Sequence, residues 1–303
     1  MNGLAPRGPS HSALTAAAAR AAHLIVDKEP FVFADTLAAA LLGERAEELI
    51  SYHRLHGGHP VLAGARAQVT CRSRYAEDCL AAAAQRGVTQ YVILGAGLDT
   101  YAYRAPLTAP PRVLEVDHPA TQQWKRAALA AAGIAVPGGV TFAAADLAGL
   151  APGQGEAGLA AALRGAGLDP AAPAFVSWLG VTMYLSPGDV AATLAGLAAL
   201  APGTEVVADY LLAPGLRDEA GATYAELVGA ASAERGEPWL SSFAPADLTA
   251  LAAGAGYGQV RHVRQGDILA GALGERADCL APSDLAVVFH GRVAAADAGV
   301  VTP

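Results

Sequence analysis

The sequence is poor in charge, in aromatic side chains and in cysteine. Of its 303 residues, 16% are charged and 6% are aromatic, and its three cysteines, Cys71, Cys79 and Cys279, form no CxxC pair. Such a sparse, odd-numbered set argues against a disulfide framework or a zinc site and is typical of a reducing cytosol. No run rich in Lys or Arg occurs and the formal net charge is −8. Both features argue against a protein that binds nucleic-acid phosphates.

Targeting and membrane-spanning segments are also missing. The first residues, MNGLAPRGPSHSALT, contain no apolar core of a signal peptide. The uncharged stretch 127–145 contains Gly133 and a Pro-Gly-Gly turn, which break it short of a membrane span. We therefore expect a soluble, cytoplasmic protein with no membrane partner and no nucleic-acid partner.

The chain is rich in small residues instead. Hydrophobic residues make up 53% of it, but many are alanines, and 34 residues are glycine. Alanine buries little area, so the percentage overstates the apolar core. A chain of this length still buries about three quarters of its unfolded surface, and its composition excludes disorder and a collagen-like fold.

Short apolar runs alternate with helical segments from residue 87 onwards. This alternation predicts βαβ units in a doubly wound α/β sheet, mostly parallel and covered on both faces. Before it, helices are expected within 13–50 and over 67–84, with a loop at 51–66 that contains a Gly-Gly pair and a proline. The expected strands are 91–97, 112–117, 140–146, 174–180 and 204–212, and then an antiparallel closing pair at 259–264 and 285–293. The expected later helices are 120–132, 188–200 and most of 213–254.

The chain is expected to form one domain over residues 1–303. Its parts are an N-terminal helical cover (1–86), a Rossmann-like core (87–212), an insertion that covers the substrate (213–258), and closing strands with a tail (259–303). The Gly/Ala-rich stretch 148–167 is expected to be a surface loop beside a short helix rather than a linker between domains.

Ligands of doubly wound sheets bind beyond the carboxyl ends of the strands, and four such ends carry suggestive residues. After the first strand, Gly95 and Gly97 in LGAGLDT let the backbone approach a ligand closely, or simply form a tight turn. A dinucleotide-binding GxGxxG motif would need glycine at position 100, which is Thr100. A nicotinamide oxidoreductase is therefore disfavoured.

Acidic residues end the second and third expected strands. Glu115 or Asp117, about 20 residues past the glycines, is placed to accept hydrogen bonds from ribose hydroxyls. The alternative for Asp117 is a helix N-cap, because a proline follows at the first turn. Asp146 can accept the exocyclic amine of an adenine while Leu147 packs on the ring, or Asp146 can be a plain cap.

Aromatic residues follow the fourth and fifth strands. Trp178 is expected in the core, and Tyr184 is the better candidate to face a substrate. Asp209 and Tyr210 either line the acceptor pocket or cap a helix. The insertion after the fifth strand adds Trp239, and such variable cover segments are where substrate choice normally lies. Tyr184, Tyr210 and Trp239 are the candidate substrate-binding residues.

Five segments together carry a family resemblance. YVILGAGLDTYAYR, LEVDHPATQQWKR, AADL, FVSWLGVTMYL and GEPWLSSF occur in an order that resembles the leucine carboxyl methyltransferase family. The nearest likeness is to its bacterial, actinobacterial branch of S-adenosylmethionine-dependent O-methyltransferases, which includes enzymes that methylate polyketide carboxylates. The resemblance implies a class I methyltransferase Rossmann-like fold, S-adenosyl-L-methionine as cofactor and S-adenosyl-L-homocysteine as product.

The resemblance also implies roles for individual residues. Its implied cofactor ligands are Gly95, Ala96 and Gly97 for the methionine part, Asp117 for the ribose, and Asp146 with Leu147 for the adenine. TCRSRYAED resembles the family's RTRFxDD helix, so Arg72, or Arg74 in another helix phase, would hold the methionine carboxylate. Leu179 stands near the cofactor where many relatives have Glu. No lysine precedes Lys28 in the first helix, unlike in eukaryotic members that methylate a protein's C-terminal leucine.

The choice of acceptor determines whether a base is needed. A carboxylate is already ionised at neutral pH and needs none, whereas a phenol would profit from one. His53, His56 and His59 are the candidate bases in the second case. Their HxxHxxH spacing in a Gly-Pro-rich loop gives no fixed metal site, so no metal is expected.

Several functions remain compatible with these patterns. The leading hypothesis is an O-methyltransferase that forms a methyl ester on a small-molecule carboxylate in secondary metabolism. The alternatives are methylation of a phenolic hydroxyl or an amine with the same fold and cofactor, and a non-catalytic regulatory protein that binds the cofactor. The sequence leaves the identity of the acceptor and the oligomeric state open.

Overall fold

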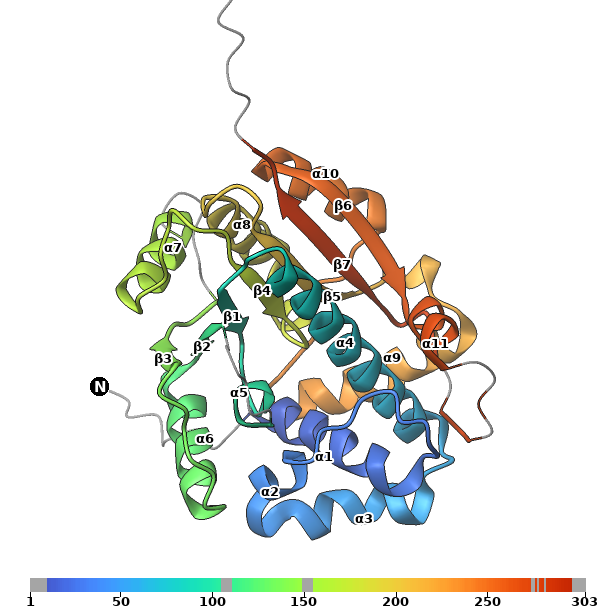
Figure 1. Ribbon diagram of the computed structural model, residues 1–303. Helices are drawn as coiled ribbons and strands as arrows, with labels where there is room; N and C mark the ends of the chain where they lie inside the picture. The colour runs from blue at the N-terminus through green and yellow to red at the C-terminus, as the bar shows by residue number, and fades with distance from the viewer. Residues whose placement is uncertain are drawn as a thin grey trace, which may run out of the picture.

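A seven-stranded sheet organises the molecule (Figure 1). The computed structural model describes residues 10–104, 111–148, 155–273, 276, 278–280 and 282–295. The strand order is β3-β2-β1-β4-β5-β7-β6. The strands are β1 (Gln90–Leu94), β2 (Arg112–Asp117), β3 (Val140–Ala144), β4 (Phe175–Trp178), β5 (Glu205–Leu211), β6 (Tyr257–Arg264) and β7 (Ala286–Val293).

The first five strands are parallel, and β7 enters antiparallel between β5 and β6. Along the chain, β1 is the first strand of the sheet, and β2 and β3 are added on one side of it. The chain then returns to form β4 on the other side of β1. The carboxyl ends of β1 and β4 are therefore neighbours from which the following connections diverge, the usual position of a ligand site in such sheets.

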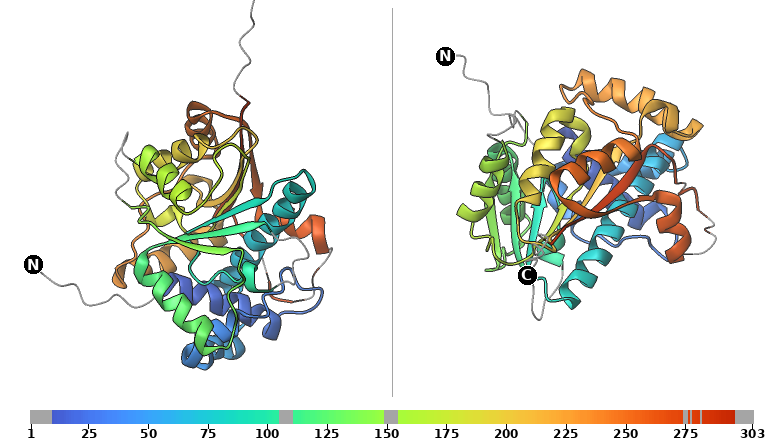
Figure 2. Two further views of the ribbon diagram at one scale, coloured as in Figure 1. Left: turned by 60° about the vertical axis from the view of Figure 1, so that its left-hand side comes forward. Right: turned by 90° about the horizontal axis from the view of Figure 1, so that it is seen from above.

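Helices cover both faces of the sheet, as the two views of Figure 2 show. They are α1 (His11–Val26), α2 (Ala38–Leu42), α3 (Ala46–His56), α4 (Pro60–Gln85), α5 (Tyr101–Arg104), α6 (Pro119–Ala131), α7 (Gly155–Gly165), α8 (Pro187–Ala198), α9 (Glu219–Glu234), α10 (Pro245–Ala255) and α11 (Gln265–Leu273). Short 3-10 turns lie at Gly43–Arg45, Thr182–Tyr184 and Pro214–Leu216. Within the described residues, none of these helices is both long and apolar enough to cross a membrane.

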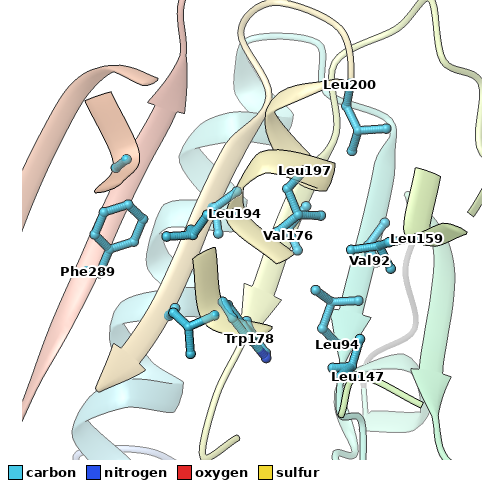
Figure 3. Close-up of a cluster of buried hydrophobic side chains, with 14 of the residues drawn as sticks. Val92, Leu94, Leu147, Leu159, Val176, Trp178, Leu194, Leu197, Leu200 and Phe289 are labelled. Atoms are coloured by element: carbon cyan, nitrogen blue, oxygen red, sulfur yellow. The ribbon is translucent and has the colours of Figure 1, made fainter. Parts of the chain in front are cut away.

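Alternating strand residues supply two hydrophobic layers. Val92, Leu94 and Trp178 face α7, α8 and α10, as Figure 3 shows for part of this cluster. Tyr91 and Ile93 of the same β1 strand face α4 and α11 on the opposite side. A third cluster joins α1, α2 and α3 to Leu129 of α6, which fixes the N-terminal helices beside the carboxyl end of the sheet.

The sequence predictions hold for all seven strands, with ends shifted by up to three residues. The predicted loop at 51–66 is wrong, since α3 extends to His56 and α4 begins at Pro60. Proline is compatible with the first turn of a helix, and His59 caps α4 by accepting a hydrogen bond from the Val61 N–H. The glycine pair therefore separates two helices rather than forming a long loop. In the predicted 148–167 segment, α7 is present, while 149–154 lie outside the described residues.

Candidate active site

A cavity of about 510 Å³ opens at the carboxyl ends of β1, β2 and β4. The turn after β1, the residues after β2 and β3, and the segment after β4 form its floor. α1 and residues 236–238 and 240 of the insertion add to its walls. The volume lies within the range of roughly 300–1,000 Å³ that is usual for small-molecule sites. The sequence-predicted segments 95–97, 146–147 and 179–184 thus come together around one space.

The turn after β1 needs its two glycines. Gly95 and Gly97 have φ of 64° and 46°, in the left-handed region that other residues adopt at a cost. A Cβ on Gly95 would lie 2.4 Å from Cγ2 of Val181 in the segment after β4. The turn therefore lies directly against that segment, and both line the cavity.

Asp117 lies at the end of β2 and closes this turn. Its Oδ2 accepts the Gly97 N–H at 2.6 Å, and its Oδ1 accepts the His118 N–H at 2.6 Å. Burial raises the pKa of Asp117 above its ordinary value, although these two N–H groups act to lower it. Its side chain lines the cavity and can accept further donors.

The other acid of β2 has a structural role. Glu115 is buried, with its carboxylate bonded to Lys125 Nζ at 2.6 Å and to the Tyr103 hydroxyl at 2.9 Å. It does not line the cavity. The choice between the two acids therefore favours Asp117 as the residue available to a ligand.

Arg72 reaches the cavity from α4, and two groups hold it there. Its Nη1 donates to Asp209 Oδ2 at 2.8 Å. The other oxygen of Asp209 accepts the Gly180 N–H at 2.5 Å. Gly180 has φ of 73°, and a Cβ there would lie 2.4 Å from Arg72 Nη2. Asp209 thus neither lines the cavity nor caps a helix, but positions both Arg72 and the segment after β4.

The alternative arginine points elsewhere. Arg74 Nε donates to Asp78 Oδ2 at 2.6 Å, one helical turn further along α4. Arg74 is absent from the cavity lining. The helix phase therefore selects Arg72.

The residues after β3 and β4 lie where the sequence predicts. Asp146 is exposed and its Oδ1 accepts the Ala148 N–H at 2.9 Å, while Leu147 is buried against the core shown in Figure 3. Leu179, the residue in the place of the relatives' glutamate, lines the cavity and packs toward the α4 face of the sheet. Tyr184 also lines the cavity.

Two predicted substrate residues do not reach the cavity. Tyr210 is 1% exposed, and its hydroxyl bonds to His262 Nδ1 at 2.9 Å on the opposite side of the strand from Asp209. Trp239 packs against Gly229 of α9, where a Cβ would lie 3.3 Å from its Cε3. Both predictions are wrong as to position, because side chains alternate along a strand and because Pro238 and Leu240, not Trp239, face inward.

The three candidate bases also lie outside the cavity lining. His53 is buried and its Nδ1 accepts from Arg66 Nη1 at 3.3 Å. Burial, together with the Arg66 charge, lowers the pKa of His53 to about 4. His56 is exposed at the end of α3, and His59 caps α4. In the described part of the chain, no group of three or more His, Cys, Asp or Glu side chains is placed to hold a metal.

Glu237 is a cavity residue that sequence reasoning missed. Its carboxylate accepts hydrogen bonds from the Ser10 hydroxyl and the His11 N–H at 2.8 and 2.9 Å, and from the Ser12 N–H at 3.0 Å. A carboxylate at a helix N-terminus is a favourable arrangement, and here it joins the insertion to α1. Because the partners are more than 220 positions apart, no local pattern indicates this contact.

The cavity wall carries excess negative charge. Its described lining contains four carboxylates, from Asp99, Asp117, Asp146 and Glu237, against two guanidiniums, from Arg20 and Arg72. Two further carboxylates neutralise these guanidiniums from behind, since Arg20 pairs with Asp35 and Arg72 with Asp209. Such a site suits a ligand that carries positive charge as well as hydrogen-bond donors.

Fold and cavity together define an α/β protein with a nucleotide-type site at the carboxyl edge of its sheet. The family sequence model described as "Leucine carboxyl methyltransferase" matches residues 13–198. This is more than half of the chain, so the chain belongs to the leucine carboxyl methyltransferase family.

Relatives share part of this sequence. A protein of Mycolicibacterium vanbaalenii is 38% identical over 158 residues, covering 50% of this chain and 48% of the relative. YktD of Bacillus subtilis is 31% identical over 206 residues, covering 65% and 63%. Each is named, as an inferred assignment, an S-adenosyl-L-methionine-dependent methyltransferase. The matches thus span about half to just under two thirds of these relatives.

Solved structures share the fold over nearly the whole chain. A methyltransferase, so named by inference, from Thermobifida fusca has a TM-score of 0.58 at 20% identity and covers 95% of this chain and 96% of its own. A DUF574-family protein from Streptomyces avermitilis has a TM-score of 0.56 at 16% identity and covers 91% and 96%. These likenesses confirm the predicted Rossmann-like methyltransferase fold.

Proposed function

We propose that the protein is an S-adenosyl-L-methionine-dependent O-methyltransferase that forms a methyl ester on a small-molecule carboxylate. The observation that carries the cofactor part of this proposal is that Asp117 and Arg72 both line one cavity, whose net charge is negative. Family membership and the names of the relatives support the reaction class. The resemblance to enzymes that act on polyketide carboxylates makes secondary metabolism the setting we propose.

The cavity residues fit the chemical groups of this cofactor. Asp117 has lone pairs for the ribose hydroxyls, and the apolar side chain of Leu147 can pack on an adenine whose amine donates to Asp146. The guanidinium of Arg72 is a fork suited to the methionine carboxylate, and only its Nη1 is engaged by Asp209. The backbone at Gly95–Gly97 can approach the methionine chain because no Cβ intervenes. The ligand's sulfonium and amine charges suit the negative wall.

Bound S-adenosyl-L-methionine supplies an electrophilic methyl group, whose bond to sulfur breaks as a bond to the acceptor oxygen forms, leaving S-adenosyl-L-homocysteine. The protein's part is to hold the acceptor oxygen in line with that methyl group and to exclude water. Tyr184 and the inward-facing Pro238 and Leu240 form the wall that is left for the acceptor. Leu179 leaves the adjoining wall apolar.

The position of the histidines favours a carboxylate over a phenol. His53, His56 and His59 are absent from the described cavity lining, whereas His118 is present but caps α6 through Nδ1. An ionised carboxylate requires no proton removal at neutral pH, so it can be methylated in a cavity whose acceptor wall offers no histidine base. A phenol would need a base, and the histidines suggested for that role lie elsewhere.

A transfer assay with the methyl-labelled cofactor and panels of carboxylic acids, phenols and amines tests the proposal. We expect label in a product that mild alkali hydrolyses, since methyl esters are cleaved under conditions that leave methyl ethers and methylamines intact. Label that survives alkali would contradict the carboxylate assignment while leaving methyl transfer intact. Cofactor binding without transfer to any of the three acceptor classes would favour a regulatory binding protein.

A further inference from the structure

A second pocket lies at the other end of the sheet. It is a groove of about 290 Å³ near the amino end of β5, and it shares no lining residue with the candidate active site. The described residues that line it are Arg86, Glu205, Gln259, Val260, Arg261, His290 and Arg292. The β6–β7 pair forms one wall at the edge of the sheet (Figure 1), and the end of α4 forms another.

Strand register places the polar side chains of the groove on one face. Arg292 of β7 lies opposite Glu205 of β5 and Gln259 of β6, and His290 lies opposite Arg261. Residues two apart along a strand share a face, so Arg261 and Arg292 are diagonal neighbours on adjacent strands. Such positions lie about 7–8 Å apart, within reach of long side chains, so both arginines can contact one ligand.

The groove carries more positive charge than its own carboxylate neutralises. It holds three guanidiniums and one carboxylate, Glu205, whose Oε1 accepts from Arg86 Nη2 at 2.5 Å. Arg261 instead donates to His290 Nδ1 from both its Nε and its Nη2, at 3.2 and 2.9 Å. Arg292 has no hydrogen bond or ion pair with another side chain in the described part of the chain and is exposed. Two of the three guanidinium charges in the groove therefore have no carboxylate of the groove to neutralise them, although the formal charge of the whole protein is −8.

The remaining titratable residue of the groove, His290, does not alter its net charge. Burial, reinforced by Arg261, lowers the pKa of His290 below its ordinary value, while Glu205 raises it. The neutral ring accepts from Arg261 and from the Tyr75 hydroxyl at Nδ1, and its Nε2 lies 3.2 Å from Glu205 Oε2. The ring thereby holds Arg261 and Glu205 in place, which makes the groove a preorganised site.

We propose that this groove binds a small phosphoryl-bearing anion, separately from the cofactor cavity. Guanidinium forks match phosphoryl oxygens in pairs. Arg292 offers such a fork, and Arg261 and Arg86 add the N–H groups that their bonds to His290 and Glu205 leave free. The volume lies close to the lower limit of roughly 300 Å³ for small-molecule sites, which suits a phosphorylated metabolite or a diphosphate.

Isothermal titration calorimetry with sodium pyrophosphate at low ionic strength tests this proposal. The wild-type protein is titrated with and without saturating S-adenosyl-L-homocysteine, and sodium sulfate at matched ionic strength replaces pyrophosphate in a parallel run. We expect one pyrophosphate site that is unaffected by S-adenosyl-L-homocysteine, with at least tenfold weaker binding of sulfate. AMP in place of pyrophosphate distinguishes a phosphomonoester from a diphosphate ligand, and binding of either supports the proposal.

Arg292→Gln and Arg261→Gln locate the binding. Each should weaken pyrophosphate binding at least tenfold, whereas Arg164→Gln, which removes an exposed arginine of α7 outside the groove, should leave it unchanged. Circular dichroism and the Tm of each variant verify folding. Substitution of Arg292 should disturb the fold less than substitution of Arg261, because Arg292 is exposed. Absence of pyrophosphate and AMP binding to the wild type, equal binding of sulfate, or unchanged binding to Arg292→Gln would each overturn the proposal. Because the cofactor is not required, the result is independent of the proposed methyl transfer.

Discussion

Asp209 on β5 and Arg72 on α4 form an ion pair at the rim of the cavity, with Nη1 and Oδ2 2.8 Å apart. The two side chains are 2% and 12% exposed, so the pair is shielded from water on most sides. The second oxygen of Asp209 holds the Gly180 N–H. One carboxylate thus determines both the direction of the arginine and the course of the chain after β4.

Asp209→Asn should weaken binding of S-adenosyl-L-methionine about tenfold and lower the free energy of unfolding by about 2 kcal/mol, as expected for loss of a hydrogen bond to a charged group. Calorimetric binding and chemical denaturation measure the two effects. Asp78→Asn is the matched control, since Asp78 pairs with Arg74 on the same helix but in solvent. An exposed pair of this kind contributes at most about 0.5 kcal/mol. Equal effects of the two substitutions would contradict the positioning role of Asp209.

Gly180→Ala should impair both cofactor binding and stability. The new Cβ would meet Arg72 Nη2 at 2.4 Å, so the guanidinium must leave its position. Gly256→Ala isolates the cost of the backbone, because Gly256 has φ of 107° but nothing within 4 Å of its Cβ position. We expect a backbone cost of about 1–2 kcal/mol of stability in both variants. In Gly180→Ala alone we expect a further loss of up to about 2 kcal/mol, because the displaced guanidinium loses its bond to Asp209, together with a loss of cofactor affinity. Unaltered affinity in Gly180→Ala would contradict the contact.

Stability should fall as the pH falls through the titration range of His53. The pKa of His53 is about 4 in the folded protein against an ordinary value of 6.5, so the unfolded chain binds more protons between these values. The resulting stabilisation is present above pH 6.5 and lost toward pH 4, and amounts to about 3 kcal/mol. The free energy of unfolding, measured by denaturation between about pH 4 and pH 7, should therefore depend less steeply on pH in His53→Gln than in the wild type. The exposed His56→Gln should follow the wild type, and identical slopes in all three proteins would refute the prediction.

Tyr184 and Tyr210 should respond differently to loss of their hydroxyls. Tyr184→Phe alters the cavity wall and should change KM for the acceptor while leaving cofactor affinity as it is. Tyr210→Phe removes the bond to His262 and should cost about 1 kcal/mol of stability without altering KM. Steady-state kinetics with each variant measures this split. A KM effect at Tyr210 instead would place the acceptor on the other side of β5.

Local sequence patterns were sufficient for most of the fold. Apolar β-branched runs such as YVIL predict β1, and the glycines after it predict the turn at 95–97, because both effects operate over a few residues. The loop predicted at 51–66 is wrong at the junction His56–Pro60 because that prediction also used local pattern alone. Gly-Gly-x-Pro is compatible with a loop or with two abutting helices, and only the packing of α3 and α4 decides between them.

The cavity was predictable where it is made by strand ends and obscure where distant segments meet. Asp117 ends β2 and Asp146 and Leu147 come shortly after β3, so the topology alone brings them together. Tyr210 could be assigned to a face only with the strand's phase relative to its neighbours. The partnerships of Arg72 with Asp209 and of Glu237 with the start of α1 join residues 137 and more than 220 positions apart, and nothing local to either partner indicates them.

Calorimetric titration with S-adenosyl-L-homocysteine tests the central claim most directly, using the wild type, Asp117→Ala and the control Asp78→Ala. Loss of the Asp117 carboxylate removes the acceptor proposed for the ribose hydroxyls, so its variant should bind at least tenfold more weakly. The wild type and Asp78→Ala should bind the ligand equally, and neither should bind NAD. Binding of NAD but not of S-adenosyl-L-homocysteine by the wild type, or unchanged affinity in Asp117→Ala, would contradict the assignment of this cavity.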